Sequence, residues 1–226
     1  MPTPDHPALL FDLDGTLVDS VYHHVLAWSD ALSAVGIEMS IWRIHRRIGM
    51  SGGLFAQALA RETDVPVDDA LRQELRERHA ASFKERLGAI APLPGARELL
   101  EGLSASGVPW AIATSGRMVT AGPLIEKLGL PVGDMTIVTR DQVAYAKPNP
   151  DLFEEAARRL GVPTSRCFVV GDSVWDILAA RRAGALGVGL LSGGYGDREL
   201  VDAGAFRVFD DPAALKRGLF ELGVRV

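Results

Sequence analysis

The chain has 226 residues, of which 47% are hydrophobic and 23% charged, and a formal net charge of −5, which is typical of a globular protein with a buried core. The negative charge and the lack of a run of Lys or Arg argue against nucleic acids and anionic membranes as partners. The single cysteine, Cys167, excludes an internal disulfide, and no segment resembles a signal peptide or a membrane span, so we expect a cytoplasmic protein.

The N-terminal part of the chain predicts one strand followed by helices. "PALLFDL" is short and apolar and ends beside Asp and Gly, which is typical of a buried parallel strand. Asp19 and Ser20 are good N-cap residues for a helix that runs to Gly36. Further helices are predicted over residues 54–61 and 68–87, and the second of these is rich in Arg and Glu. Residues 18–87 are therefore expected to form an all-helical block.

From residue 88 onward, strands and helices alternate. Four short apolar segments predict strands: "VPWAIAT", "MTIVT", "RCFVVGD" and "ALGVGLL". A weaker candidate is "FRVFD", which precedes a helix from about Pro212. Such alternation predicts an α/β fold, a Rossmann-like parallel sheet with helices on both faces. The expected domains are an α/β core of residues 1–17 and 88–226, and a helical cap domain of residues 18–87 inserted after the first strand.

The polar residues that follow the predicted strands define a candidate active site. Ligands of open α/β sheets bind outside the carboxyl ends of the strands. There the sequence places three acidic groups, two hydroxyls and a lysine, namely Asp12, Asp14, Asp172, Thr114, Ser115 and Lys147. These groups suit phosphoryl transfer to a carboxylate.

Charge arithmetic predicts a cation at this site. A phosphate near three carboxylates meets repulsions of roughly 4 kcal/mol for each unit-charge pair at 4 Å. Mg²⁺ held by Asp12, Asp14 and Asp172, together with Lys147, would offset this repulsion. Asp12 could then attack phosphorus, and Asp14 could protonate the leaving oxygen and later activate water. The spacing of two residues places both carboxylates on one side of an extended segment.

Four ordered segments resemble the motifs of the haloacid dehalogenase superfamily. They are "DLDGT" at 12–16, the Thr that ends "WAIAT", Lys147 in "KPNPD" and "GDSVWD" at 171–176. The likeness spans nearly the whole chain and points to the helical-cap branch, which includes β-phosphoglucomutase and phosphoglycolate phosphatase.

The resemblance implies a role for each matching residue. Asp12 would be the nucleophile and a Mg²⁺ ligand, and Asp14 would be the acid/base and bind the metal through its backbone carbonyl. Asp172 would complete the metal site, with Asp176 supporting it from behind or binding through water. Thr114, the Ser115 backbone and Lys147 would hold the phosphate, and Leu13 would line the substrate site.

The expected activity is a Mg²⁺-dependent phosphatase acting on a small phosphorylated metabolite, as a monomer or homodimer. Asp14 favours phosphate esters over organic halides, because a halide leaving group needs no proton. A sugar-phosphate mutase and a phosphate-accepting signalling module remain alternatives. The glycines of "GVGLLSGGYG" lack the spacing of a dinucleotide-binding loop and are expected in turns.

The predicted helical cap supplies candidates for substrate contact. "IHRRIGMSGG", residues 44–53, places basic residues beside a Gly/Ser loop that resembles the specificity loop of the family. Arg47 is the first candidate to contact the substrate, with Arg46 and Ser51 behind it, although a solvated arginine face is an equal alternative. His24 is expected at the solvent or at the domain boundary. The charged helix around His79 is typical of a surface, and a substrate contact by Arg78, His79 or Lys84 is the less favoured alternative.

Overall fold

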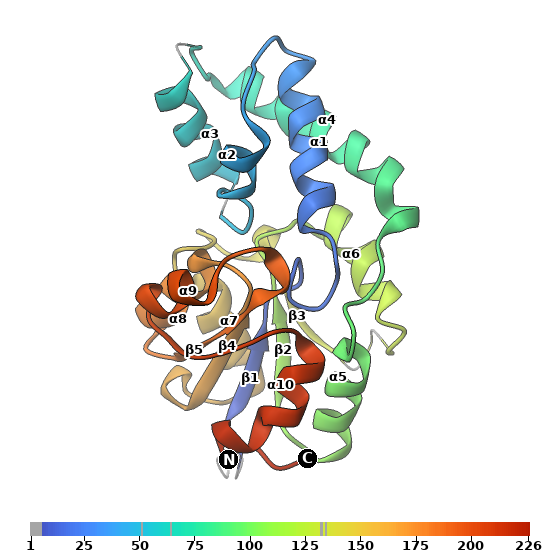
Figure 1. Cartoon of the computed structure of the whole chain (residues 1–226), viewed down its shortest axis with the longest axis vertical. Helices are drawn as coiled ribbons and strands as arrows, with labels where there is room; N and C mark the ends of the chain where they lie inside the picture. The colour runs from blue at the N-terminus through green and yellow to red at the C-terminus, as the bar shows by residue number, and fades with distance from the viewer. Residues whose placement is uncertain (1–5, 51, 64, 132, 134) are drawn as a thin grey trace.

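The computed structural model contains a six-stranded parallel sheet in the order β3-β2-β1-β4-β5-β6 (Figure 1). It describes all residues except 1–5, 51, 64, 132 and 134. The strands are β1 (Ala8–Phe11), β2 (Trp110–Ala113), β3 (Thr136–Val138), β4 (Cys167–Gly171), β5 (Leu186–Leu190) and β6 (Ala205–Phe209). All six predicted strands and the parallel α/β fold class are confirmed.

The central strand β1 is buried on both faces because helices cover each of them. Leu9 and Phe11 pack on one side with residues of α5 (Ala96–Ala105), α6 (Met118–Lys127) and α10 (Pro212–Gly218). Ala8 and Leu10 pack on the other side against α7 (Asp151–Leu160) and α8 (Val174–Ala183). This alternation along a strand explains why its sequence is uniformly apolar. Another helix that follows the sheet strands, α9 (Asp197–Ala203), packs beside β6.

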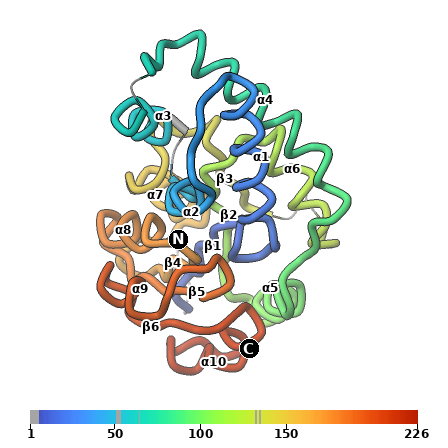
Figure 2. The backbone as a smooth tube through the Cα atoms, turned by 45° about the horizontal axis from the view of Figure 1, so that its top comes forward, coloured from blue at the N-terminus to red at the C-terminus, as the bar shows by residue number. Residues whose placement is uncertain are grey.

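Four α-helices lie between β1 and α5 in the described chain: α1 (Val21–Ser33), α2 (Ile41–His45), α3 (Gly52–Glu62) and α4 (Asp69–Arg86). We call residues 21–86 the helical insertion. In Figures 1 and 2 it stands over the carboxyl ends of the strands. It has a hydrophobic cluster of its own, which includes Val25, Leu32, Ile44 and Leu59. No helix in the described part of the chain has the length and apolar character needed to cross a membrane.

Two local expectations are wrong. Gly52 and Gly53 of the expected Gly/Ser loop belong to the start of α3, and the basic residues before them follow directly on the short helix α2. Gly187 and Gly189 lie within β5 rather than in turns. They are small because helices approach the sheet there: a Cβ on Gly189 would lie 2.9 Å from Cδ1 of Leu200.

Candidate active site

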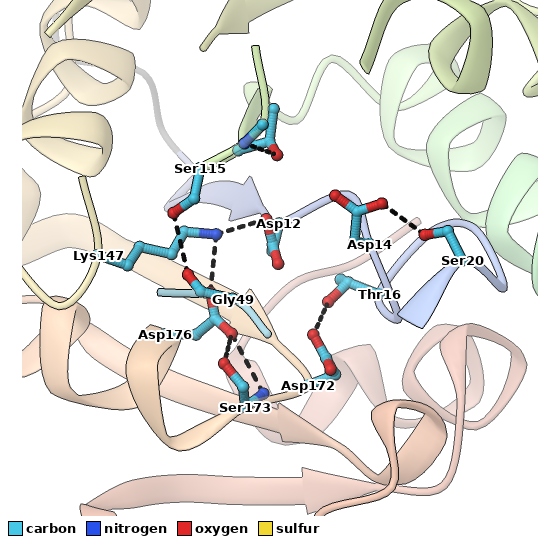
Figure 3. Close-up of polar contacts among 12 residues, drawn as sticks. Asp12, Asp14, Thr16, Ser20, Gly49, Ser115, Lys147, Asp172, Ser173 and Asp176 are labelled. Carbon is cyan, nitrogen blue, oxygen red and sulfur yellow. Dashed lines mark hydrogen bonds and ion pairs between the residues drawn. The ribbon is translucent and has the colours of Figure 1, made fainter. Parts of the chain in front are cut away.

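The centre of the site is a buried lysine between two aspartates (Figure 3). Asp12 directly follows β1, and Lys147 lies in the segment between β3 and α7. Lys147 Nζ contacts Asp12 Oδ1 and lies 2.8 Å from Asp176 Oδ1, and the lysine side chain is completely buried. Burial alone would lower the pKa of Lys147, but the two carboxylates outweigh it and raise the pKa above its ordinary value. Lys147 therefore remains charged.

Asp12, Asp172 and Asp176 form a buried acidic cluster, each with one oxygen within 4.8 Å of the others. Burial raises the pKa of Asp12 to about 7 although the charge of Lys147 lowers it, and burial together with the charges of Asp176 and Asp12 raises the pKa of Asp172 well above its usual value. A single lysine cannot neutralise three carboxylates. The cluster therefore fits a divalent cation, for which carboxylate oxygens are suitable ligands.

The backbone comes close to the Asp172 carboxylate at two positions, and both are glycines. A Cβ on Gly193 would overlap the Asp172 carboxylate, and one on Gly15 would lie 2.6 Å from Asp172 Oδ2. Gly15 also has a φ of +74°, which favours glycine. Thr16 Oγ1 donates to Asp172 Oδ1 at 3.3 Å. These contacts fix the carboxylate beside the loop that carries Asp12.

Asp176 lies in the first turn of α8, and both of its oxygens are held by protein groups. Its Oδ2 accepts hydrogen bonds from Ser173 N at 3.1 Å and Ser173 Oγ at 2.5 Å, which also caps the helix. Its Oδ1 pairs with Lys147. Asp176 thus anchors the lysine that contacts Asp12.

The Asp14 side chain points away from the acidic cluster. Its Oδ1 accepts a hydrogen bond from Ser20 Oγ at 2.5 Å and contacts His24 Nε2 at 3.0 Å. Burial would raise the pKa of Asp14, but the charge of His24 and the hydrogen bonds from His24 and Ser20 lower it below the ordinary value. Ser20 precedes α1 as expected, yet its hydroxyl binds Asp14 instead of capping the helix.

The two hydroxyl residues after β2 have different partners. Thr114 Oγ1 accepts a hydrogen bond from Gly116 N at 2.9 Å. Ser115 Oγ donates to the Gly49 carbonyl at 3.0 Å and so joins the sheet to the helical insertion. The Leu13 side chain is buried in the hydrophobic core, so that only its backbone is available to a ligand.

A cavity of about 450 Å³ lies between the strand ends and the helical insertion. Asp12, Asp14, Thr114 and Ser115 line it, but Lys147, Asp172 and Asp176 do not. The insertion contributes an apolar wall that includes Trp28 and Phe55. Three further arginines, which the sequence analysis did not single out, also line the cavity: Arg76, Arg117 and Arg140.

The predicted cap residues have mixed positions. Arg47 lines the cavity, but its guanidinium pairs with Glu62. Arg46 pairs with Glu199 at 2.9 Å, outside the cavity lining. Ser51 lies outside the described residues. The partners of both arginines are distant in sequence, which is why the pattern of basic residues did not reveal them.

Two histidines of the helical insertion also line the cavity. His24 contacts Asp14 and so lies where the insertion meets the sheet domain, one of the two positions expected for it, but its contact with Asp14 was not expected. His79 is buried, so the expectation of a surface position is wrong. The sequence feature that could have revealed this burial is the four-residue spacing of Leu75, His79 and Phe83, which places them on one buried face of α4.

Comparison with known proteins shows the family to which the chain belongs. A phosphoglycolate phosphatase of Agrobacterium fabrum is 34% identical over 222 residues, covering 96% of this chain and 94% of that protein. Hexitol phosphatase A of Escherichia coli is 33% identical, covering 77% of this chain and 78% of that protein. The crystal structure of a hydrolase from Pseudomonas syringae superposes with a TM-score of 0.94 at 50% identity, covering 96% and 99% of the two chains. The family model for haloacid dehalogenase-like hydrolases matches residues 6–184, and the chain therefore belongs to that family.

Proposed function

We propose that the protein is a Mg²⁺-dependent phosphatase that hydrolyses a small phosphorylated metabolite through an aspartyl phosphate on Asp12. The observation that carries this proposal is the position of Asp12, which lines the cavity, contacts Lys147 and belongs to the acidic cluster. The names of the two curated relatives, a phosphoglycolate phosphatase and a hexitol phosphatase, support phosphate monoesters as the substrate class.

The first step transfers the phosphoryl group to the protein. A carboxylate oxygen of Asp12 attacks phosphorus, and the bond from phosphorus to the ester oxygen breaks. The acid form of Asp14 gives its proton to the departing oxygen, which leaves as an alcohol. Lys147 keeps Asp12 oriented through the contact with Oδ1, while Thr114 and the Ser115 backbone lie at the same cavity wall to hold the phosphate.

The second step releases phosphate. Asp14, now ionised, takes a proton from water, and the water oxygen attacks phosphorus. The bond between phosphorus and Asp12 breaks, and both carboxyl groups return to their initial states. The lowered pKa of Asp14 favours the ionised form that this second step needs and makes the acid form used in the first step the less populated one.

The acidic cluster would hold the metal ion. Asp12 and Asp172 are the expected side-chain ligands, with the Asp14 backbone carbonyl as a third, and Asp176 keeps Lys147 in place beside them. When bound, Mg²⁺ would supply positive charge to the phosphate oxygens. The helical insertion, joined to the sheet by the Ser115–Gly49 hydrogen bond, would act as a cap whose opening and closing admits the substrate.

The sharpest test uses the two aspartates separately. Asp14→Asn should release one equivalent of p-nitrophenol from p-nitrophenyl phosphate and then stop, because nitrophenolate leaves without a proton but the phosphoenzyme lacks its base. Borohydride reduction and peptide mass spectrometry should then find residue 12 reduced to the alcohol. Asp12→Asn should give neither the burst nor the modification.

Steady turnover by Asp12→Asn at the wild-type rate would contradict the assigned nucleophile. A single stoichiometric phosphorylation of the wild-type protein would instead favour the signalling module. Conversion of a sugar 1-phosphate to its 6-phosphate, stimulated by a bisphosphate, would favour the mutase. A screen that includes phosphoglycolate and hexitol phosphates, ranked by kcat/KM, would identify the substrate.

A further inference from the structure

A chain of two histidines leads from Asp14 into the helical insertion. His24 on α1 contacts Asp14 Oδ1 through Nε2 at 3.0 Å, and its Nδ1 lies 3.0 Å from Nε2 of His79 on α4. The two imidazole planes differ by only 15°. Both nitrogens of His24 are therefore engaged, one by the proposed acid/base and the other by His79.

Aromatic packing holds the two rings in place. The His79 ring stacks on Trp28 with centroids 4.3 Å apart, and the His24 ring stacks on Phe83 at 3.8 Å. The burial of His79 and the neighbouring His24 lower the pKa of His79 well below its ordinary value, so this ring is neutral and has one N–H. One hydrogen lies between the two histidines, and a flip of the His24 ring would break both of its contacts.

The hydrogen bonds to Asp14 distinguish its two oxygens. Ser20 Oγ and His24 Nε2 both approach Oδ1. Among the described residues, none donates a hydrogen bond to Oδ2, although Asp14 lines the cavity. Ser20, whose hydroxyl also lies 3.5 Å from the Val18 carbonyl, and His24 both occupy Oδ1. Oδ2 is therefore the oxygen left free to carry the exchangeable proton.

We propose that His79 is a positioning residue: through His24 it keeps the Nε2–H directed at Asp14 Oδ1, so that the proton exchanged in catalysis is carried by Oδ2. This inference rests on the proposed function, because it assigns Asp14 as the acid/base. The geometry also makes proton transfer depend on the insertion, since α1 and α4 carry the two histidines.

Two substitutions of His79 separate hydrogen bonding from packing. His79→Phe keeps a ring between Trp28 and Phe83 but removes the nitrogen that faces His24. His79→Gln loses the ring, while its terminal amide can reach the position of Nε2. A positioning role predicts that Gln retains function and Phe does not. A packing role predicts the reverse order.

The kinetic readout is the dependence on the leaving group, measured as kcat/KM, which reports the steps up to alcohol release. For 2-phosphoglycolate, whose alkoxide needs a proton, His79→Phe should lower kcat/KM by about ten- to a hundred-fold. For p-nitrophenyl phosphate, the loss should be less than about three-fold, because nitrophenolate leaves unprotonated. The control is His23→Phe, the adjacent histidine, which does not line the cavity. Equal losses for the two esters, or a change in KM alone, would overturn the inference.

A second readout does not require turnover. The His24 Nε2–H should give a downfield imidazole proton resonance, assigned by its loss in His24→Phe. It should vanish in His79→Phe and persist in His79→Gln and His23→Phe. Persistence in His79→Phe would show that His24 needs no second histidine. If the wild-type protein hydrolysed neither ester, the proposed function would fail, while this resonance would still decide the role of His79.

Discussion

Besides abolishing activity, Asp12→Asn should change how the stability of the protein depends on pH. The pKa of Asp12 in the folded protein is about 7, compared with an ordinary value of 3.8, chiefly because the carboxyl is buried. The folded state therefore binds a proton more tightly than the unfolded state does. Between about pH 4 and pH 7 the metal-free wild-type protein should lose stability as pH rises, and above pH 7 the loss should level off.

The size of the effect follows from this difference in pKa. It corresponds to about 4 kcal/mol of free energy of unfolding above pH 7. Asparagine resembles the neutral acid and carries no charge at any pH. The variant should therefore be close to the wild-type protein in stability near pH 4 and more stable than it by up to about 4 kcal/mol at pH 8.

Urea denaturation in EDTA at several pH values between 4 and 8 measures this difference. Asp210→Asn, which replaces an exposed aspartate, is the control and should show a nearly constant difference over the same range. Adding Mg²⁺ at pH 8 should stabilise the wild-type protein more than Asp12→Asn. A stability difference between Asp12→Asn and the wild-type protein that stays within about 1 kcal/mol from pH 4 to pH 8 would refute the electrostatic account.

Two further substitutions test the surroundings of Asp12. Lys147→Met leaves Asp12 and Asp176 without their buried cation and should lower the free energy of unfolding by roughly 3–5 kcal/mol at pH 8. The loss should be smaller at pH 5, where protonation of the carboxylates can relieve the charge. Equal losses in urea denaturation at both pH values would contradict this reasoning. Gly193→Ala places a Cβ against the Asp172 carboxylate and should cost about 1–3 kcal/mol and weaken the thermal stabilisation by Mg²⁺, whereas Gly88→Ala, where no atom lies within 4 Å, should leave that stabilisation intact. An unchanged response of Gly193→Ala to Mg²⁺ would argue against a metal at Asp172.

The sheet could be predicted from sequence because its signals are local. Strands β1, β2, β4 and β5 are short apolar runs, and the polar residues that follow β1 and β4, Asp12 and Asp172, mark the edge where ligands bind. The approach of these residues to one another then follows from parallel topology. Local pattern therefore sufficed for the fold class and for the residues at the strand ends, whereas Asp176, which pairs with Lys147, was identified only through the resemblance to a known family.

Contacts between distant segments were not predictable in the same way. Arg47 pairs with Glu62, and His79 meets His24 across 55 positions of sequence. The direction of the Asp14 side chain depends on Ser20 and His24, which no spacing rule links to a carboxylate. Such partners are set by how α1 and α4 pack, and that packing depends on the whole helical insertion.

Because the insertion follows the central strand β1, the insertion can change while the sheet stays the same. The insertion follows β1 in the chain and contributes no strand to the described sheet. Its exchange for another helical segment would therefore leave the hydrogen bonds between the strands in place. Two residues of the insertion, Ala27 and Phe83, do contact the core of the sheet domain, because they belong to the same hydrophobic cluster as Leu9 and Phe11. A graft would therefore have to preserve these two anchors, and also His24 and His79, to keep the contacts to Asp14 while the rest of the cavity wall is exchanged.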